Sequence, residues 1–138
     1  REQHVRREKP PGNICSTQAL CGRTATVYLA AMGPGGLAEV ASQCYSKAHY
    51  AAQQISAIPG FEPQYQGEYF HAFVTGCPVC PEKLMAELEK PGILGGLPLS
   101  DREILWCATE MNTKEEMDEA ASIVRNVLEC GHKEVCGS

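Results

Sequence analysis

Short runs of proline and glycine divide this chain of 138 residues and limit what it can fold into. They fall at residues 33–36 (GPGG), 59–60 (PG) and 91–92 (PG). Proline lacks an amide hydrogen and fixes φ, and glycine loses the most conformational entropy on ordering, so neither continues a helix or strand well. These breaks predict a few separate elements, and the length suits one domain.

The first two segments have the spacing of helices. Residues 16–32 predict one helix, with Ser16 as its N-cap and an apolar face of Leu20, Thr24, Val27, Tyr28 and Ala31. Residues 37–58 predict a second helix. Its alanine-rich stripe permits close packing and consists of Leu37, Val40, Ala41, Cys44, Ala48, Ala51, Ala52 and Ile55.

The next segments change period. Residues 69–75 alternate in aromatic and β-branched side chains, which predicts a strand. Pro81 suits the first position of a short helix that turns Leu84, Met85 and Leu88 inward. Residues 93–99 are either a short strand or an ordered loop. Residues 104–108 predict a second strand, with Trp106 as its largest core candidate.

The last helix has the clearest start. Thr113 and Glu116 form the T-x-x-E pattern of a capping box, in which each side chain satisfies a free backbone amide. The inward stripe behind it is Met117, Ala120, Ala121, Val124 and Leu128. Two helices followed by strand, helix, strand and helix predict an α+β fold, a small antiparallel sheet with helices packed on one face.

Charge is unevenly distributed. Residues 1–9 carry a net charge of +2, and the remainder carries −7, for a total of −5. An acidic body argues against a nucleic-acid groove, which needs clustered positive charge. No apolar run approaches the roughly 18 residues of a membrane helix. We therefore expect a soluble cytoplasmic protein that binds neither nucleic acid nor a membrane.

Eight cysteines are present, and Cys15, Cys21, Cys44 and Cys107 lie within apolar patterns. Free cysteine behaves as a small hydrophobic residue, so we expect these four to be reduced and buried.

The sequence Cys77-Pro78-Val79-Cys80 leaves three alternatives open. It is a redox dithiol, half of a zinc site, or a loop pair without chemistry. A zinc site needs a second half from the segment CGHKEVC, which holds Cys130, His132 and Cys136 at an unfamiliar spacing. The βαβ surroundings of a thioredoxin-like site are missing, so the loop pair is favoured.

Other catalytic patterns are not found in the sequence. The four histidines lack metal-ligand spacing, and His49 beside an apolar stripe is expected to be packed or on the surface. There is no Ser/His/Asp set, no nucleophile elbow and no phosphate loop. By itself the chain shows no catalytic machinery.

Six segments carry a resemblance: REQHVRREK with NICSTQAL, then GPGGLAEVA, SKAHYAAQ, GILGGLPL and ATEMNTKEEMDEA. In this order they resemble the P-protein of the glycine cleavage system, glycine dehydrogenase (decarboxylating). The form that the chain looks like is the C-terminal portion of the first, or alpha, subunit of the split bacterial enzyme. The resemblance covers nearly the whole chain.

The resemblance implies part of a pyridoxal-phosphate enzyme of the aminotransferase-like fold type (fold type I). That enzyme releases carbon dioxide from glycine and passes the aminomethyl group to the lipoyl arm of the H-protein. The cofactor and its lysine would belong to the partner beta subunit, and this chain alone would bind none and be inactive. Residues 1–14 would be a charged linker from a missing large domain, and residues 15–138 the small C-terminal domain with its leading helices.

The resemblance also marks candidate site residues, although it marks none as catalytic. Arg6, Arg7, Asn13, Ser16 and Thr17 match or neighbour its most distinctive motif and gather at a helix start, where an anion binds well. We expect them at the edge of the partner's active site. The alternative is that they cap the helix.

Two other functions compete with this one. The first is a stand-alone cysteine-rich module that holds zinc through Cys77 and Cys80, and the second is a structural assembly domain.

Overall fold

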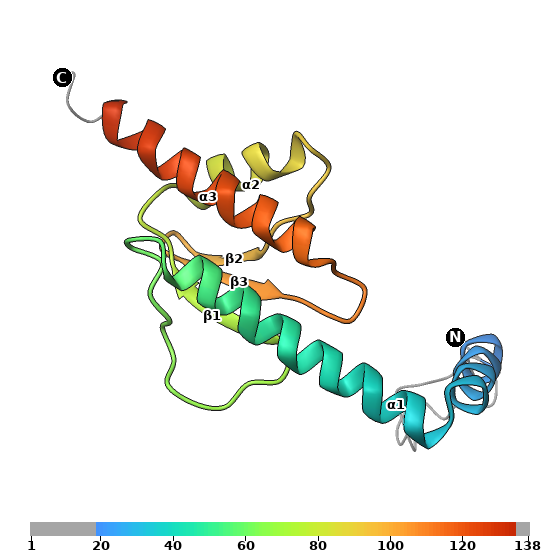
Figure 1. Ribbon diagram of the computed structural model, residues 1–138. Coiled ribbons are helices and arrows are strands. Elements are labelled where there is room, and N and C mark those ends of the chain that lie inside the picture. The colour runs from blue at the N-terminus through green and yellow to red at the C-terminus, as the bar shows by residue number, and fades with distance from the viewer. Residues whose placement is uncertain (1–18, 135–138) are drawn as a thin grey trace, which may run out of the picture. The chain divides into compact units, whose positions relative to one another are not determined.

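The computed structural model describes residues 19–134, with side chains described for residues 20–129. The elements are α1 (Ala19–Ser56), β1 (Ala72–Gly76), α2 (Pro81–Glu89), β2 (Leu97–Ser100), β3 (Glu103–Cys107) and α3 (Lys114–Glu134) (Figure 1). The chain forms two compact units, Arg1–Ala38 and Glu39–Ser138. The division predicted between residues 14 and 15 lies outside the described residues and stays a prediction.

Gly33 interrupts α1, as the sequence predicted. Its φ of 61° and ψ of −179° are not helical, so α1 is two helices joined at a kink. The second helix begins at Pro34, three residues earlier than predicted, because proline fits the first position of a helix, where no amide needs a partner. It ends at Ser56, just before the turn at Pro59 and Gly60.

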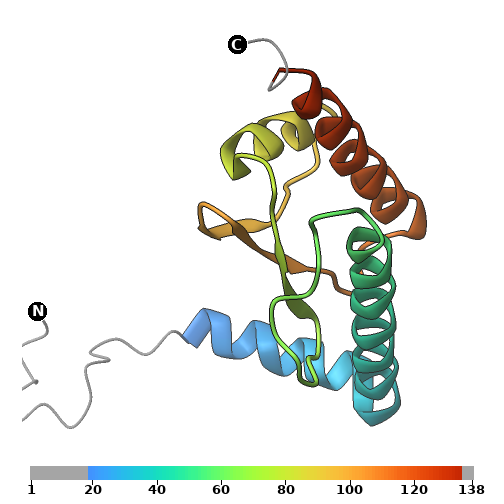
Figure 2. The same cartoon turned by 90° about the vertical axis from the view of Figure 1, so that its left-hand side faces the viewer.

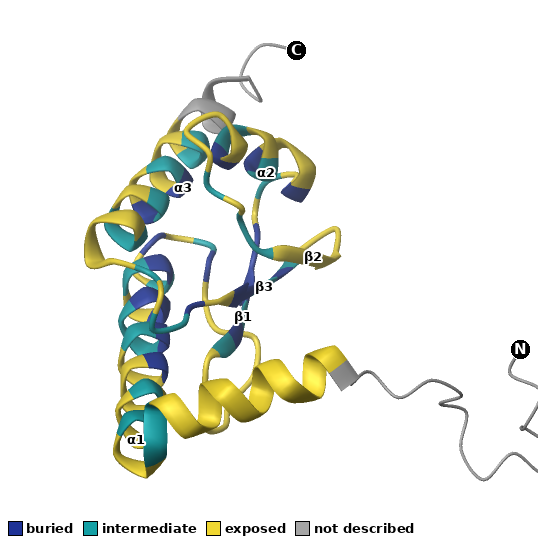
Figure 3. Cartoon of the chain, turned by 90° about the vertical axis from the view of Figure 1, so that its right-hand side faces the viewer, coloured by how far each residue is buried: buried dark blue, intermediate teal, exposed yellow. Residues whose placement is uncertain are grey.

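Residues 19–32 form the predicted helix, and its apolar face is exposed. Leu20 is 78% exposed and Val27 is 68% exposed, and Tyr28 is exposed as well. Figure 3 shows this stretch as almost entirely exposed.

The sheet is antiparallel with the strand order β1-β3-β2, which confirms the predicted α+β class. In its register Phe73 pairs with Trp106 and Thr75 pairs with Ile104, and all four side chains are buried. The segment 93–99 divides, since its end forms β2 while its start is a loop. β1 begins at Ala72, later than predicted, because its partner strand β3 ends at Cys107.

Helices cover one face of this sheet. Within the second unit, the α1 segment from residue 39 onward and α3 lie on the same side of the strands, and α2 packs beside α3 at one end of the sheet (Figure 2). The core between the layers includes Ala48, Ala51, Ala52, Ile55, Phe73, Leu84, Leu88, Ile104, Trp106 and Val124. The predicted stripes face the core in α2, in α3 and from Ala48 to Ile55 of α1, whereas Leu37 and Val40 are half-buried and Ala41 is exposed.

The capping box at the start of α3 is confirmed. The Thr113 amide donates to Glu116 Oε2 at 2.8 Å, and the Glu116 amide donates to Thr113 Oγ1 at 3.2 Å. Trp106 is buried as predicted, with 6% exposure, and its Nε1 donates to Thr75 Oγ1 at 2.9 Å.

The cysteine prediction is correct for Cys44 and wrong for Cys21 and Cys107. Cys44 is 7% exposed, whereas Cys21 and Cys107 are exposed. Successive strand residues point to opposite faces, so the inward Trp106 places Cys107 outward. Cys21 lies on the exposed helix of residues 19–32, and Cys15 lies outside the described residues.

Within residues 19–134, no helix combines the length and the apolar character needed to cross a membrane.

Candidate functional site

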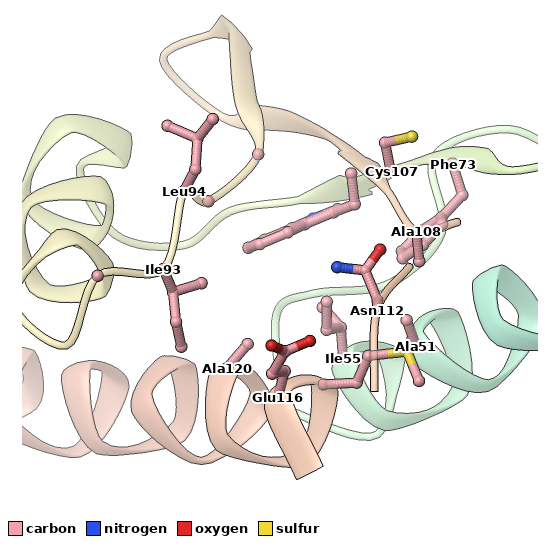
Figure 4. Close-up of a pocket in the computed structure, with 15 residues that line it drawn as sticks. Ala51, Ile55, Phe73, Ile93, Leu94, Cys107, Ala108, Asn112, Glu116 and Ala120 are labelled. Atoms are coloured by element: carbon pink, nitrogen blue, oxygen red, sulfur yellow. The ribbon is translucent and has the colours of Figure 1, made fainter. Parts of the chain in front are cut away.

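A cavity of about 280 Å³ lies in the second unit. Its walls come from α1 (Ala51, Ile55), the strands (Phe73, Trp106, Cys107), the loop of residues 92–96, and the start of α3 (Glu116, Met117, Ala120) (Figure 4). Most of this lining is apolar. A concave apolar surface with a few polar groups is the usual form of a small-molecule site.

Glycines in the loop of residues 92–96 allow it to close against the sheet. A Cβ on Gly96 would lie 2.5 Å from the Leu105 carbonyl oxygen and 2.5 Å from Ile104 Cγ2. A Cβ on Gly95 would lie 2.7 Å from Met85 Sδ. A side chain at residue 96 would therefore collide with the backbone of β3, so Gly96 is needed for the close approach of this loop, which forms one wall of the cavity.

Two polar side chains, Asn112 and Glu116, point into the cavity (Figure 4). Asn112 Oδ1 accepts a hydrogen bond from the Thr109 amide at 2.9 Å, which leaves the amide nitrogen of the side chain directed inward. Glu116 is held by the capping box with Thr113. Both groups are thus fixed by backbone bonds, and together they offer a ligand one donor and one carboxylate.

A second polar cluster joins α1 to the loop before α3. Cys44 Sγ donates to Glu110 Oε2 at 3.0 Å, and Lys47 Nζ donates to the Glu110 carbonyl oxygen at 2.5 Å. The bond from Cys44 lowers the pKa of the Glu110 carboxyl, and it raises the pKa of the Cys44 thiol. This cluster holds the loop of residues 109–113 against α1.

Tyr50 makes the corresponding link to α3. Its hydroxyl donates to Asp118 Oδ1 at 2.5 Å, and Lys114 Nζ lies 3.5 Å from Asp118 Oδ2. The bond to Asp118 is the main reason why the pKa of Tyr50 is raised. These contacts fix the start of α3, which carries Glu116.

His49 is packed between aromatic rings, which confirms the expectation of a packed or surface position. Its ring stacks on Tyr69 with centroids 4.2 Å apart and an interplanar angle of 6°, and it lies 4.0 Å from the Tyr45 ring. His49 Nδ1 is 2.8 Å from the Tyr45 carbonyl oxygen.

The site residues predicted from the sequence lie elsewhere. Arg6, Arg7, Asn13, Ser16 and Thr17 fall outside the described residues, so their role stays a prediction.

The zinc alternative also stays a prediction. Cys77 and Cys80 are described, but the side chains of Cys130, His132 and Cys136 are not. Among the side chains that the structure describes, no three histidine, cysteine or acidic groups lie together as a metal site.

Sequence reasoning missed the cavity itself. Glu116 was identified as a helix cap, and Asn112 was not singled out. The sequence did contain a signal for the cavity, because two short segments lie beside predicted strands. Residues 92–96 (GILGG) are glycine-rich, and residues 108–113 (ATEMNT) are polar. Their proximity was not visible, because it depends on how the sheet brings residues 51–55, 92–96 and 106–120 together.

Comparisons with known proteins show the family to which this chain belongs. The family model described as "Glycine cleavage system P-protein" matches residues 1–124. The chain also resembles a crystal structure of glycine decarboxylase (P-protein) of the glycine cleavage system in an inhibitor-bound form. The TM-score is 0.80 and the identity 29%, covering 91% of this chain and 30% of that one. The chain therefore belongs to the glycine cleavage system P-protein family.

Curated relatives narrow the comparison. Probable glycine dehydrogenase (decarboxylating) subunit 1 of Moorella thermoacetica is 44% identical over 134 residues, which is 93% of this chain and 30% of the relative. The proteins of the same name from Desulfitobacterium hafniense and Thermomicrobium roseum are 44% and 43% identical over 86% and 91% of the chain. The chain thus spans about 30% of the length of the curated relatives it matches.

Proposed function

We propose that this chain is the C-terminal part of the first subunit of a split glycine dehydrogenase (decarboxylating). The observation that carries the proposal is the 44% identity to a subunit 1 protein over 134 aligned positions, which cover 93% of this chain. The similarity of the fold to a P-protein structure, with a TM-score of 0.80, also supports the proposal.

The proposed reaction is that of the whole enzyme. Glycine loses carbon dioxide, and the remaining aminomethyl group passes to the lipoyl H-protein. When bound, pyridoxal phosphate supplies an electron sink for the carbon-carbon bond that breaks. The partners would be the second, beta subunit and the H-protein.

The described residues do not fit a site for that cofactor. A pyridoxal-phosphate site needs a lysine amine that forms a Schiff base. The cavity lining includes neither lysine nor arginine. Lys47, Lys90 and Lys114 are engaged by the Glu110 carbonyl, Glu87 and Asp118 respectively, and Lys83 is exposed on α2. We propose that the cofactor lysine lies in the second subunit, and we assign no chemical step to the described residues of this chain.

The contribution that we propose for this chain is to form one part of the wall of a binding site. Its glycine-rich loop, Asn112 and Glu116 form a fixed recess on a small domain. Backbone amides of the same loop and helix start hold both polar groups, so the recess is preorganised in the absence of a partner.

A trapping experiment tests the assignment of the cofactor. The chain, purified alone, is mixed with pyridoxal phosphate and borohydride, and then the same treatment is applied together with the second subunit. We expect a reduced lysine adduct on the second subunit and none on this chain. A stoichiometric adduct at one lysine of this chain alone would overturn the assignment, and mass spectrometry of tryptic peptides distinguishes the two outcomes.

A further inference from the structure

The turn between β1 and α2 holds two cysteines that the proposed function does not use. Cys77 follows β1 directly, and Cys80 is the N-cap residue of α2. Cys77 is buried, with 4% exposure, and Cys80 is exposed. Both line one surface recess together with Asp101 and Arg102. One thiol thus faces solvent while the other lies behind it in the same turn.

The backbone of this turn is fixed by its neighbours. The Cys77 amide donates to the Arg102 carbonyl oxygen at 2.8 Å, and the Leu84 amide donates to the Cys80 carbonyl oxygen at 3.2 Å. A Cβ on Gly60 would lie 2.6 Å from Pro78 Cγ, so Pro78 packs directly on that glycine. The two cysteines are therefore held three residues apart on a turn whose backbone is fixed by its neighbours.

Each thiol is held by a group within the same short segment. Cys77 Sγ donates to the Val79 carbonyl oxygen at 3.1 Å, and Cys80 Sγ donates to Glu82 Oε2 at 2.8 Å. The bond from Cys80 is the main reason why the pKa of Glu82 is lowered. Burial raises the pKa of the Cys77 thiol, and the charge of Cys80 acts in the same direction. Both thiols are thus engaged by groups within the segment of residues 77–82.

We propose that Cys77 and Cys80 form a thiol–disulfide exchange pair that reacts with low-molecular-weight disulfides. Cys80 is the thiol that attacks first, because it is exposed whereas Cys77 is buried, and it attacks once its hydrogen bond to Glu82 Oε2 is released. Cys77 is the resolving thiol. The pair stands apart from the proposed glycine chemistry and depends on no property of the partner subunit.

The exchange balances in two steps. The Cys80 thiolate attacks one sulfur of the small disulfide, forms a mixed disulfide and releases one thiolate. The Cys77 thiolate then attacks Cys80 Sγ and releases the second thiolate, which leaves a Cys77–Cys80 bond. The protein loses two protons and two electrons, and the small disulfide is reduced to two thiols.

Cys44 and Cys107 provide an internal comparison. They also differ in burial, and the charge of Cys107 contributes to the raised pKa of Cys44. However, Cys44 lies on α1 and Cys107 on β3, so a bond between them depends on the spacing of two separate elements. The pair within one turn is therefore the one we expect to exchange.

The test uses the full chain in a glutathione redox buffer, quenched with acid and mapped by mass spectrometry. We expect the oxidised protein to carry a Cys77–Cys80 bond and no retained glutathione at either residue. Cys77→Ser removes the resolving thiol, so glutathione should accumulate on Cys80. Cys80→Ser should leave Cys77 unmodified, because its sulfur is buried. Cys107→Ser is the matched control and should give the same yield of the bond as the unaltered chain.

Three results would overturn the proposal. The first is a stable glutathione adduct on Cys80 of the unaltered chain, since that means no resolution. The second is a disulfide that joins Cys44 and Cys107 in place of the turn pair. The third is persistence of both turn thiols at a glutathione ratio that oxidises Cys107. All three are read from the unaltered chain, so they stand even where a variant fails to fold.

Discussion

Thr75 is a polar residue in the middle of the apolar core. It has no exposed surface, and its Oγ1 accepts the indole hydrogen of Trp106 at 2.9 Å. The strand register places Thr75 opposite Ile104, one inward position along from the pair of Phe73 with Trp106. The bond therefore satisfies the one polar atom of the largest core side chain.

Replacing Thr75 tests this bond. Thr75→Val keeps the shape and removes the acceptor, so the indole hydrogen is left buried without a partner, at a cost of about 1–3 kcal/mol. Thr75→Ser keeps the acceptor and is the control for the lost methyl group. Urea denaturation measures both. A Thr75→Val protein as stable as the unaltered chain would show that the bond contributes nothing.

Two tyrosine hydroxyls and two cysteine thiols hold their protons more tightly in the folded chain than in the unfolded chain. The pKa of Tyr50 is raised by its bond to Asp118, and those of Tyr69 and Cys77 are raised by burial. The pKa of Cys44 is raised by its bond to Glu110. Their ordinary values are 9.0 for the thiols and 10.0 for the phenols.

Stability should therefore fall at high pH. Above about pH 9 the unfolded chain loses protons that the folded chain keeps, so the free energy of unfolding decreases as pH rises. Tyr50→Phe should reduce the slope above about pH 10, because one of the shifted groups is gone. Urea denaturation between pH 7 and 11 measures this slope. A free energy that is flat or rising over that range would contradict the assignment of these shifts.

At the scale of elements, Gly33 decides the form of α1. Its φ of 61° with ψ near 180° is a conformation that side-chain-bearing residues rarely adopt. A Cβ there would meet nothing within 4 Å, so the constraint is the backbone and not a clash. Gly35 is equally open and has ordinary helical surroundings.

These two glycines make a matched pair of substitutions. Gly33→Ala should destabilise the protein by about 1–3 kcal/mol, because alanine must adopt a strained conformation. Gly35→Ala should instead stabilise it by about 0.5–1 kcal/mol, since it reduces the entropy lost on helix formation. Thermal and urea unfolding of both variants give the comparison. Equal changes of the same sign in the free energy of unfolding would mean that the kink in α1 does not require glycine at residue 33.

The sequence predicted the elements better than the site. Proline and glycine end helices through local backbone chemistry, and a buried stripe repeats at a fixed period, so α1, α2 and α3 were recognisable. The mistaken burial of Cys107 came from counting apolar neighbours without deciding which strand face Trp106 occupies. The cavity was not predictable, because Ile55, Ile93 and Glu116 meet only after the sheet and helices have packed.

At the scale of the whole molecule, the chain matches only part of the proteins that it resembles. It spans about 30% of its subunit 1 relatives, and it covers 30% of the P-protein structure that it resembles. We propose that its cavity shapes a site that other residues complete. The central claim is therefore that this chain can replace the equivalent part of a glycine dehydrogenase.

A chimera measures that claim most directly. The matching 134 residues of the Moorella thermoacetica relative are replaced by this chain, and the second subunit, the H-protein and pyridoxal phosphate are added. The measured quantity is carbon dioxide released from carboxyl-labelled glycine, with the unaltered relative as the reference. The account predicts release that requires both subunits. A chimera that folds, binds the second subunit and releases no carbon dioxide would contradict it.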